Sequence, residues 1–83
     1  MYNPFLSPNA RKFLKRCIDK NRIIKKIKDL SSSPFPSDVK RVAGRSEKVF
    51  RAKVEPYRIL YVVFEDKKEI LVSDIDKRSR VYD

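Results

Sequence analysis

The sequence predicts an α+β fold, with an N-terminal antiparallel helical hairpin packed on one face of a three- to four-stranded, mostly antiparallel sheet. Two observations carry this prediction. Apolar residues recur at helical spacing before residue 31, and strand-like segments follow only after residue 38. Helices that precede strands favour an α+β sandwich over alternating βαβ units. The 83 residues predict one domain, spanning residues 1–83.

Two amphipathic helices are predicted in the first part of the chain. Ser7 and Pro8 form a helix-start signal, because serine caps helices and proline favours the first helical position. The first apolar face consists of Phe13, Leu14, Cys17 and Ile18. A short corner at residues 19–22 follows. The second apolar face consists of Ile23, Ile24, Ile27 and Leu30. Basic residues occupy the rest of both helices, so one stripe of each is expected to be buried.

The second half of the chain is predicted to form strands. Residues 31–38 contain two prolines and a serine cluster, which end the second helix. The predicted strands span residues 39–42, 49–54, 57–64 and 69–76. The segment 57–64 is almost wholly apolar or aromatic, as expected of a central strand. The helices should cover one face of this sheet and leave the other face open to a partner.

Three cations lie inside the two central strands. Arg51 and Lys53 share a face, because side chains alternate across a strand. With a turn at residues 55–56, Lys53 lies opposite Arg58, and opposite residues of an antiparallel pair share a face. Like charges so placed destabilise a sheet by a few tenths to about 1 kcal/mol per pair. The hairpin has no acid on this face, and the acids between residues 65 and 69 lie around its opposite end. A phosphate is the expected occupant; a solvated strand face is the alternative.

The composition also indicates a polyanionic partner. The net charge is +10, which suits nucleic acid, an anionic membrane surface or an acidic protein segment. Cys17 is the single cysteine, so it is expected to be a core residue rather than part of a disulfide or zinc site. The absence of histidine removes the commonest metal ligand and general base. With no signal-peptide pattern and no apolar run long enough to cross a bilayer, a soluble, cytoplasmic protein is expected.

The order of these segments resembles the RelE toxins of the RelE/ParE superfamily. The resemblance is carried by V-K-R-V-A-G, V-F-R-A-K-V, Y-R-I-L-Y and a closing K-R-S-R-V-Y, and it covers nearly the whole chain. It implies a RelE/ParE-like fold and the toxin of a type II toxin-antitoxin system. Such a toxin is a ribosome-dependent endoribonuclease, an mRNA interferase that cuts messenger RNA in the decoding site and inhibits translation. The resemblance also implies an acidic RelB-type antitoxin that folds on the toxin, no metal or small-molecule cofactor, and no membrane partner.

The resemblance further implies the catalytic residues. They fall on Arg51, Lys53, Arg58, Arg78 and Tyr82. Arg51 and Arg58 would stabilise the charge that develops when the ribose 2′-hydroxyl attacks the adjacent phosphate. Lys53 would act as general base, since neighbouring cations lower the pKa of a lysine. Arg78 would stabilise or protonate the leaving 5′-oxygen, and Tyr82 would stack on a base. Some relatives have lysine at both positions of the basic strand, so Arg51 is a departure.

Other basic residues are expected to bind RNA phosphates. They are Lys40, Arg41, Arg45, Lys77 and Arg80. For any one of them an ordinary solvated side chain is the alternative. Two other functions stay open: a ParE-like inhibitor of DNA gyrase, and a non-catalytic RNA-binding module. ParE proteins generally lack the full basic-plus-tyrosine set, so its presence favours the RelE activity.

Overall fold

The computed structural model describes residues 1–42 and 48–77 and confirms the α+β prediction. Two helices, α1 (Pro8–Arg16) and α2 (Lys20–Ser32), pack on a five-stranded sheet of order β1-β5-β4-β3-β2. The strands are β1 (Asn3–Leu6), β2 (Lys40–Arg41), β3 (Val49–Val54), β4 (Tyr57–Phe64) and β5 (Glu69–Lys77). Each described pair of neighbouring strands is antiparallel except β1 and β5, which run parallel. The observed bounds of β3 and β4 are the same as the predicted ones, 49–54 and 57–64.

The start of α1 is the one that the sequence predicts. The Ser7 hydroxyl accepts a hydrogen bond from the Ala10 N–H at 3.1 Å and donates one to the Ser73 carbonyl at 2.7 Å. The cap thus also ties the helix to β5. The helix ends at Arg16, with Cys17 as a half-buried C-cap residue. Ile18 is 95% exposed, so its predicted place on the apolar face is wrong. The corner lies at residues 17–19 rather than 19–22, because α2 begins at Lys20.

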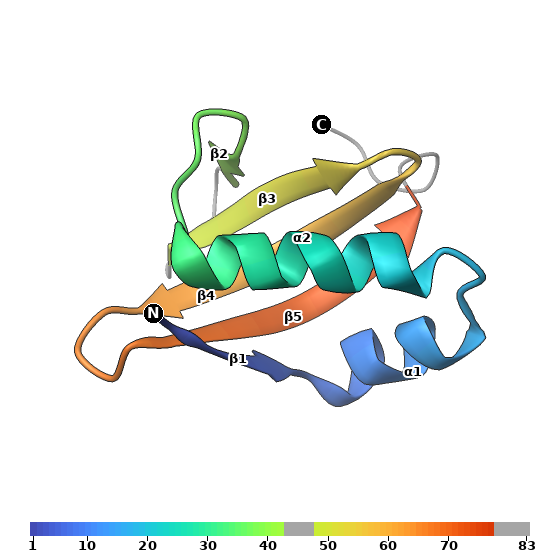
Figure 1. Ribbon diagram of the computed structural model, residues 1–83, viewed down its shortest axis with the longest axis horizontal. Coiled ribbons are helices and arrows are strands. Elements are labelled where there is room, and N and C mark those ends of the chain that lie inside the picture. The colour runs from blue at the N-terminus through green and yellow to red at the C-terminus, as the bar shows by residue number, and fades with distance from the viewer. Residues whose placement is uncertain (43–47, 78–83) are drawn as a thin grey trace.

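The two helices bury their apolar stripes against one face of the sheet. α2 contributes Ile23, Ile27 and Leu30, as predicted, and it packs against β1 and β3 (Figure 1). α1 packs mainly against β5. The core of the described chain consists of Ala10, Leu14, Ile23, Ile27, Leu30, Ala52, Tyr57, Ile59, Tyr61, Ile70, Val72 and Ile75. No helix of the described residues is long and apolar enough to cross a membrane.

The fifth strand, β1, lies outside the sequence-based prediction of three or four strands. It is short, contains Pro4, and forms an edge of the sheet beside β5. Proline lacks a backbone N–H and is tolerated on an edge strand, where one side of the backbone has no partner strand. The strand is held at its start by hydrogen bonds from the Tyr2 N–H to the Ser31 carbonyl and from the Asn3 N–H to the Lys68 carbonyl, both 2.8 Å long.

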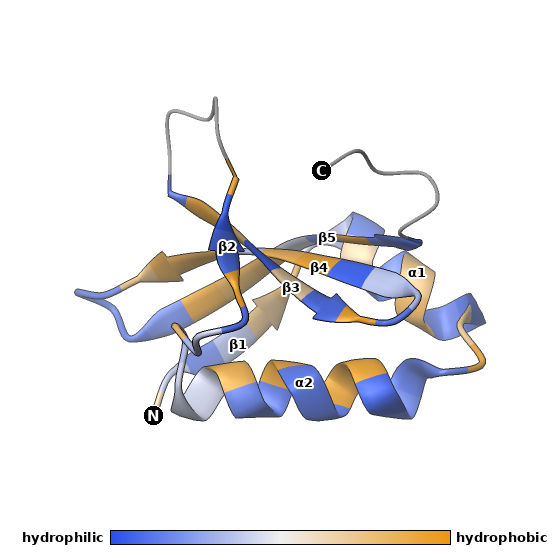
Figure 2. Cartoon of the chain, turned by 90° about the horizontal axis from the view of Figure 1, so that it is seen from above, coloured by the Kyte–Doolittle hydropathy of each residue, from blue (hydrophilic) through white to orange (hydrophobic). Residues whose placement is uncertain are grey.

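The opposite side of the sheet has no helix over it in the part of the chain that the structure describes. Figure 2 shows α2 running along one side of the sheet only. We call this side the open face. Because Ala52, Ile59 and Tyr61 point into the core, the residues that alternate with them point to the open face. From β2 to β5 these residues are Lys40, Val49, Arg51, Lys53, Arg58, Leu60, Val62, Phe64, Glu69, Leu71, Asp74 and Asp76.

Candidate active site

The register of the central hairpin brings the three predicted cations together. Lys53 of β3 is in register with Arg58 of β4, and Arg51 is in register with Leu60. Since registered residues share a face, all of these side chains project from the open face. β2 extends the group, because Lys40 is in register with Arg51. The predicted clustering of Arg51, Lys53 and Arg58 is therefore confirmed, whereas their catalytic roles stay a prediction.

Arg58 is the most buried of these cations. It is 1% exposed, whereas Arg51 and Lys53 are half-buried. A guanidinium remains charged in a protein, and removing it from water is expensive unless its surroundings compensate the charge. The fold thus holds a permanent cation at the centre of the open face, where an apolar side chain would pack at a lower desolvation cost.

The structure corrects the prediction that no acid offsets these cations. The prediction holds for the β3–β4 hairpin alone, because β5 adds two carboxylates beside these cations and a third, Glu69, at the far end of the same face. Asp76 is in register with Arg58, and Asp74 is in register with Leu60. Each carboxylate accepts a backbone hydrogen bond from the next residue, 2.9 Å long for Asp74 and 2.7 Å for Asp76. These bonds orient both side chains locally.

A β-bulge in β5 is the reason that these acids reach the open face. Leu60 pairs with Asp74, but its neighbour Tyr61 pairs with Val72, so Ser73 is the extra residue. Without the bulge, Asp74 and Asp76 would continue the alternation of Ile70 and Val72 and would point towards the helices. The sequence carries a signal of this shift: apolar residues stand at 70 and 72, and the next one stands at 75 rather than 74.

The open face is therefore electrostatically divided. One row across the strands reads Lys40, Arg51, Leu60, Asp74, and the next reads Lys53, Arg58, Asp76. Both rows carry cations on the β2–β3 side and a carboxylate on the β5 side. A phosphate is attracted to the cationic half, and the carboxylates mark the limit of that half.

The other predicted site residues are spread more widely. Lys40 is exposed on the open face, but Arg41 is in register with Phe50 and so belongs to the opposite face. Lys77 is exposed at the end of β5, in register with the core residue Tyr57. Arg45, Arg78, Arg80 and Tyr82 lie outside the described residues. The structure thus brings together Lys40, Arg51, Lys53 and Arg58, and it separates Arg41 and Lys77 from them.

Tyr57 is a structural tyrosine beside this site. Its hydroxyl donates a hydrogen bond to Asp19 Oδ2 at 2.9 Å, and its ring meets Phe13 edge-to-face at 5.8 Å. Hydrogen bonding to Cys17 and then to Asp19, followed by burial, raises the pKa of Tyr57 above its ordinary value. The phenol therefore stays protonated at neutral pH and fixes the corner between α1 and α2 against β4.

The chain is similar to RelE proteins in sequence and in structure. A RelE1 protein of Methanocaldococcus jannaschii is 34% identical over 59 residues, which cover 68% of this chain and 64% of that relative's length. The archaeal RelE–RelB complex of Pyrococcus horikoshii contains a similar structure, with a TM-score of 0.81 and 23% identity, covering 96% of this chain and 98% of that one. The isolated Escherichia coli RelE toxin gives a TM-score of 0.78 at 20% identity, covering 93% of this chain and 84% of that one.

The two structural likenesses show the fold, and a family model shows the membership. The model of the ParE toxin of type II toxin-antitoxin systems matches residues 5–82, which is nearly the whole chain. The predicted resemblance is thereby confirmed at the level of the superfamily. This chain belongs to the RelE/ParE superfamily of type II toxin-antitoxin toxins.

Proposed function

We propose that this protein is a ribosome-dependent endoribonuclease that cuts messenger RNA in the decoding site and so inhibits translation. The observation that supports this most directly is the burial of Arg58 at 1% exposure, with Lys53 in register beside it on the open face. Stability alone would favour an apolar side chain there. Fixed cations in a partly desolvated site are what a phosphoryl group needs when negative charge develops on it.

The proposed reaction is attack of a ribose 2′-hydroxyl on the adjacent phosphate, without a metal ion. RNA crossing the open face would place its phosphoryl oxygens against the half-buried Arg51, with the charge of the buried Arg58 beneath them. A guanidinium can donate two parallel hydrogen bonds to two such oxygens, which suits it to this task better than an ammonium. Removal of one such donor from an active site typically costs about 2.7–4 kcal/mol of transition-state stabilisation.

The proposed partner in the resting cell is a RelB-type antitoxin. The Pyrococcus horikoshii relative was crystallised as a RelE–RelB complex. The net charge of +10 suits an acidic segment that folds as it binds. The same surface would bind ribosomal RNA after the antitoxin is lost.

Cleavage of messenger RNA on programmed ribosomes tests the proposal. The wild-type protein should cut between nucleotides of the decoding site, mapped by primer extension. Arg58→Met should lower the single-turnover rate by about 10²–10³-fold, because the fixed charge at the phosphate is lost. Lys25→Ala, a change on the exposed side of α2, is the matched control and should keep the wild-type rate. Absence of cutting by the wild-type protein would overturn the proposal.

Inhibition of DNA gyrase is the second candidate function, because the matching family model is described as a ParE toxin. A supercoiling assay with purified gyrase separates the two activities. We expect supercoiling to continue at the uninhibited rate. Inhibited supercoiling without messenger cleavage would establish the gyrase activity instead. Ribosome binding with neither effect would indicate a non-catalytic RNA-binding module.

A further inference from the structure

One row of the open face places a lysine, an arginine and an aspartate side by side. Lys53 of β3 is in register with Arg58 of β4, and Arg58 is in register with Asp76 of β5. Neighbouring strands lie about 4.8 Å apart, so the backbones at Lys53 and Asp76 are about 10 Å apart. Arg58, buried between them, forms the floor of the row. A phosphate seated over Arg58 would have an ammonium on one side and a carboxylate on the other.

Asp76 is held in a position from which it can act on a bound group. Its side chain is half-buried, and its Oδ1 accepts the Lys77 N–H at 2.7 Å. A carboxylate has about four lone-pair sites, so this bond leaves room for a second donor such as a hydroxyl. The bulge at Ser73 is what directs this carboxylate to the row of Arg58 rather than to the core.

We propose that Asp76 accepts the proton of the attacking ribose 2′-hydroxyl and that the ammonium of Lys53 protonates the departing 5′-oxygen. This inference rests on the ribonuclease function proposed above. The 2′-oxygen bonds to phosphorus as the bond from phosphorus to the 5′-oxygen breaks. The products are a 2′,3′-cyclic phosphate and a 5′-hydroxyl. Asp76 ends protonated and Lys53 ends neutral, and proton exchange with water restores both.

The charge states of the two side chains support these roles. A carboxylate accepts a proton directly, whereas a lysine acts as a base only after it has lost one. An ammonium, in contrast, is ready to donate. Lys53 thus takes the opposite role from the general base that the sequence favours, and Arg58 stabilises the charge on the phosphoryl oxygens between the two groups.

The surroundings of Asp76 give the RNA a path past it. Asp74, Asp76, Lys12 and Arg16 line a groove between α1 and β5. An RNA strand leaving the row on the β5 side would therefore meet two further cations, Lys12 and Arg16. Lys77 and Asp74 also line the grooves that Asp76 lines, and Arg58 of β4 is in register with Asp76.

Single-turnover cleavage on programmed ribosomes tests the base. Asp76→Asn keeps the shape of the side chain and should lower the rate by about 10²–10⁴-fold. Asp29→Asn is the control, since Asp29 is the same residue type at an exposed position of α2, on the covered side of the sheet; it should stay within about threefold of wild type. Asp76→Glu, which retains a carboxylate, should keep more activity than Asp76→Asn. Circular dichroism and ribosome affinity establish that each variant is folded.

A chemically altered messenger tests the acid. Replacing the bridging 5′-oxygen at the cut site by sulfur gives a leaving group that departs without a proton. Lys53→Met should cut the normal messenger poorly and the sulfur-substituted one within about tenfold of wild type, whereas Asp76→Asn should be slow on both. A Lys53→Met variant that sulfur does not rescue would overturn the acid role, and wild-type cutting by Asp76→Asn would overturn the base role. If the wild-type protein cuts no messenger, the proposed function fails, and this inference fails with it.

Discussion

At the scale of single residues, Arg58 and Tyr61 show that one face of a strand belongs to the core and the other to the candidate site. Both belong to β4, and both are almost fully buried, at 1% and 0% exposure. Tyr61 points into the core, where its hydroxyl donates a hydrogen bond to the Pro34 carbonyl at 2.6 Å and secures the proline loop. Arg58 points to the open face, where its charge adds a desolvation cost. Such locally unfavourable choices are expected where a site requires them.

Tyr61 makes the stability of the protein fall at high pH. Burial, and then the negative charge of Asp38, raises the pKa of Tyr61 to about 12 from an ordinary value of 10.0. The neutral phenol is thus favoured in the folded state, and its contribution is present below about pH 10 and is lost as the pH rises to about 12. A shift of this size corresponds to about 2–3 kcal/mol.

Urea unfolding of the wild-type protein and of Tyr61→Phe, at about pH 9 and about pH 12, measures this contribution. The wild-type protein should lose about 2–3 kcal/mol more than the variant between the two conditions. The other ionisable groups are the same in both proteins, so their effect cancels in the comparison. An equal loss in the free energy of unfolding for the two proteins between these pH values would contradict the assignment of the pH dependence to Tyr61.

At the scale of elements, the bulge in β5 decides which face each side chain of that strand's second half occupies. Before Ser73, Ile70 and Val72 point into the core; after it, Ile75 does so and Asp76 points to the open face. Ser73 is also where α1 is attached, because the Ser7 hydroxyl donates to the Ser73 carbonyl and the Ser73 hydroxyl donates to the Leu60 carbonyl at 3.3 Å. One irregular residue therefore joins the helix cap, the core and the open face.

Insertion of one alanine between Asp74 and Ile75 should destabilise the fold far more than one added residue in a loop would. Continuous alternation after the inserted residue would turn Ile75 outwards and Asp76 towards the helices, so we expect a loss of at least about 3 kcal/mol in the free energy of unfolding. Ser73→Ala is the control and removes only a hydrogen bond, for an expected loss of about 1 kcal/mol or less. Urea unfolding measures both. Similar small losses for the two variants would show that the register adapts to the inserted residue.

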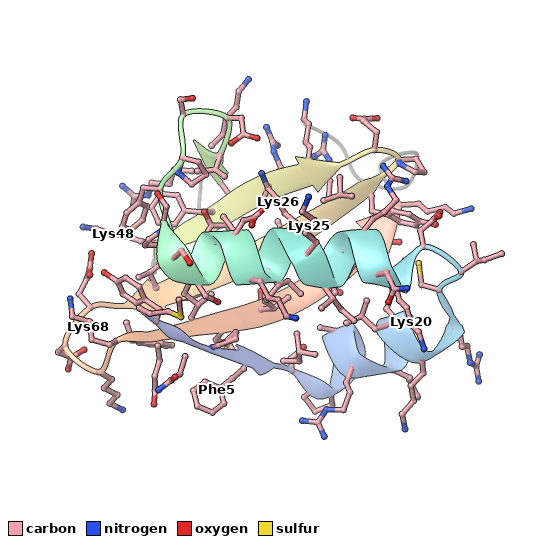
Figure 3. All side chains as sticks on the ribbon, viewed as in Figure 1. Phe5, Lys20, Lys25, Lys26, Lys48 and Lys68 are labelled. Carbon is pink, nitrogen blue, oxygen red and sulfur yellow. The ribbon has the colours of Figure 1, made fainter. Side chains whose placement is uncertain are left out.

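At the scale of the whole molecule, positive charge is spread over several surfaces. The surface on which a basic residue lies decides whether it can contact RNA bound at the open face. Lys20, Lys25 and Lys26 belong to α2 on the covered side of the sheet, and Lys68 belongs to the turn between β4 and β5 (Figure 3). Lys26 is paired with Asp38 at 3.1 Å. Lys40, in contrast, lies on the open face in register with Arg51. The general charge favours encounter with RNA, and the open face is where binding would become specific.

Neighbouring residues of β2 allow this distinction to be measured. Lys40 and Arg41 are both exposed, but they belong to opposite faces of the sheet. Lys40→Ala should weaken binding to programmed ribosomes and reduce the slope of log affinity against log salt by about 0.7, the value for one phosphate contact on a single strand. Arg41→Ala should change the slope less. A messenger with a 2′-deoxyribose at the cut site prevents cleavage during the measurement. Equal effects of the two substitutions would contradict a role for the open face.

Local sequence patterns were sufficient to predict the central hairpin and the start of α1. Alternation of side chains around a short turn was enough to predict three features of the hairpin. These are the bounds of β3 and β4, the turn at residues 55–56, and the register of Lys53 with Arg58. The Ser7 cap likewise depends on residues within one helical turn. These features were predictable because each is decided by neighbours in the sequence.

Features that depend on distant segments were not predictable in the same way. β1 is four residues long and contains proline, and it becomes a strand only because the edge of β5 is available to it. Ile18 fits the helical period but falls beyond the end of α1. The shift of apolar residues from 72 to 75 was present in the sequence, but its meaning depends on how β5 pairs with β4.

The sequence by itself determined that three cations share one face of a hairpin, because the alternation of side chains along a strand is a local property. Only the tertiary structure decided what stands beside them. Pairing of β4 with β5 around the bulge at Ser73 brings Asp76 next to Arg58, which is 1% exposed in the folded chain. Register between strands and burial depend on residues far apart in the chain, so the carboxylate side of the site becomes visible only in the folded molecule.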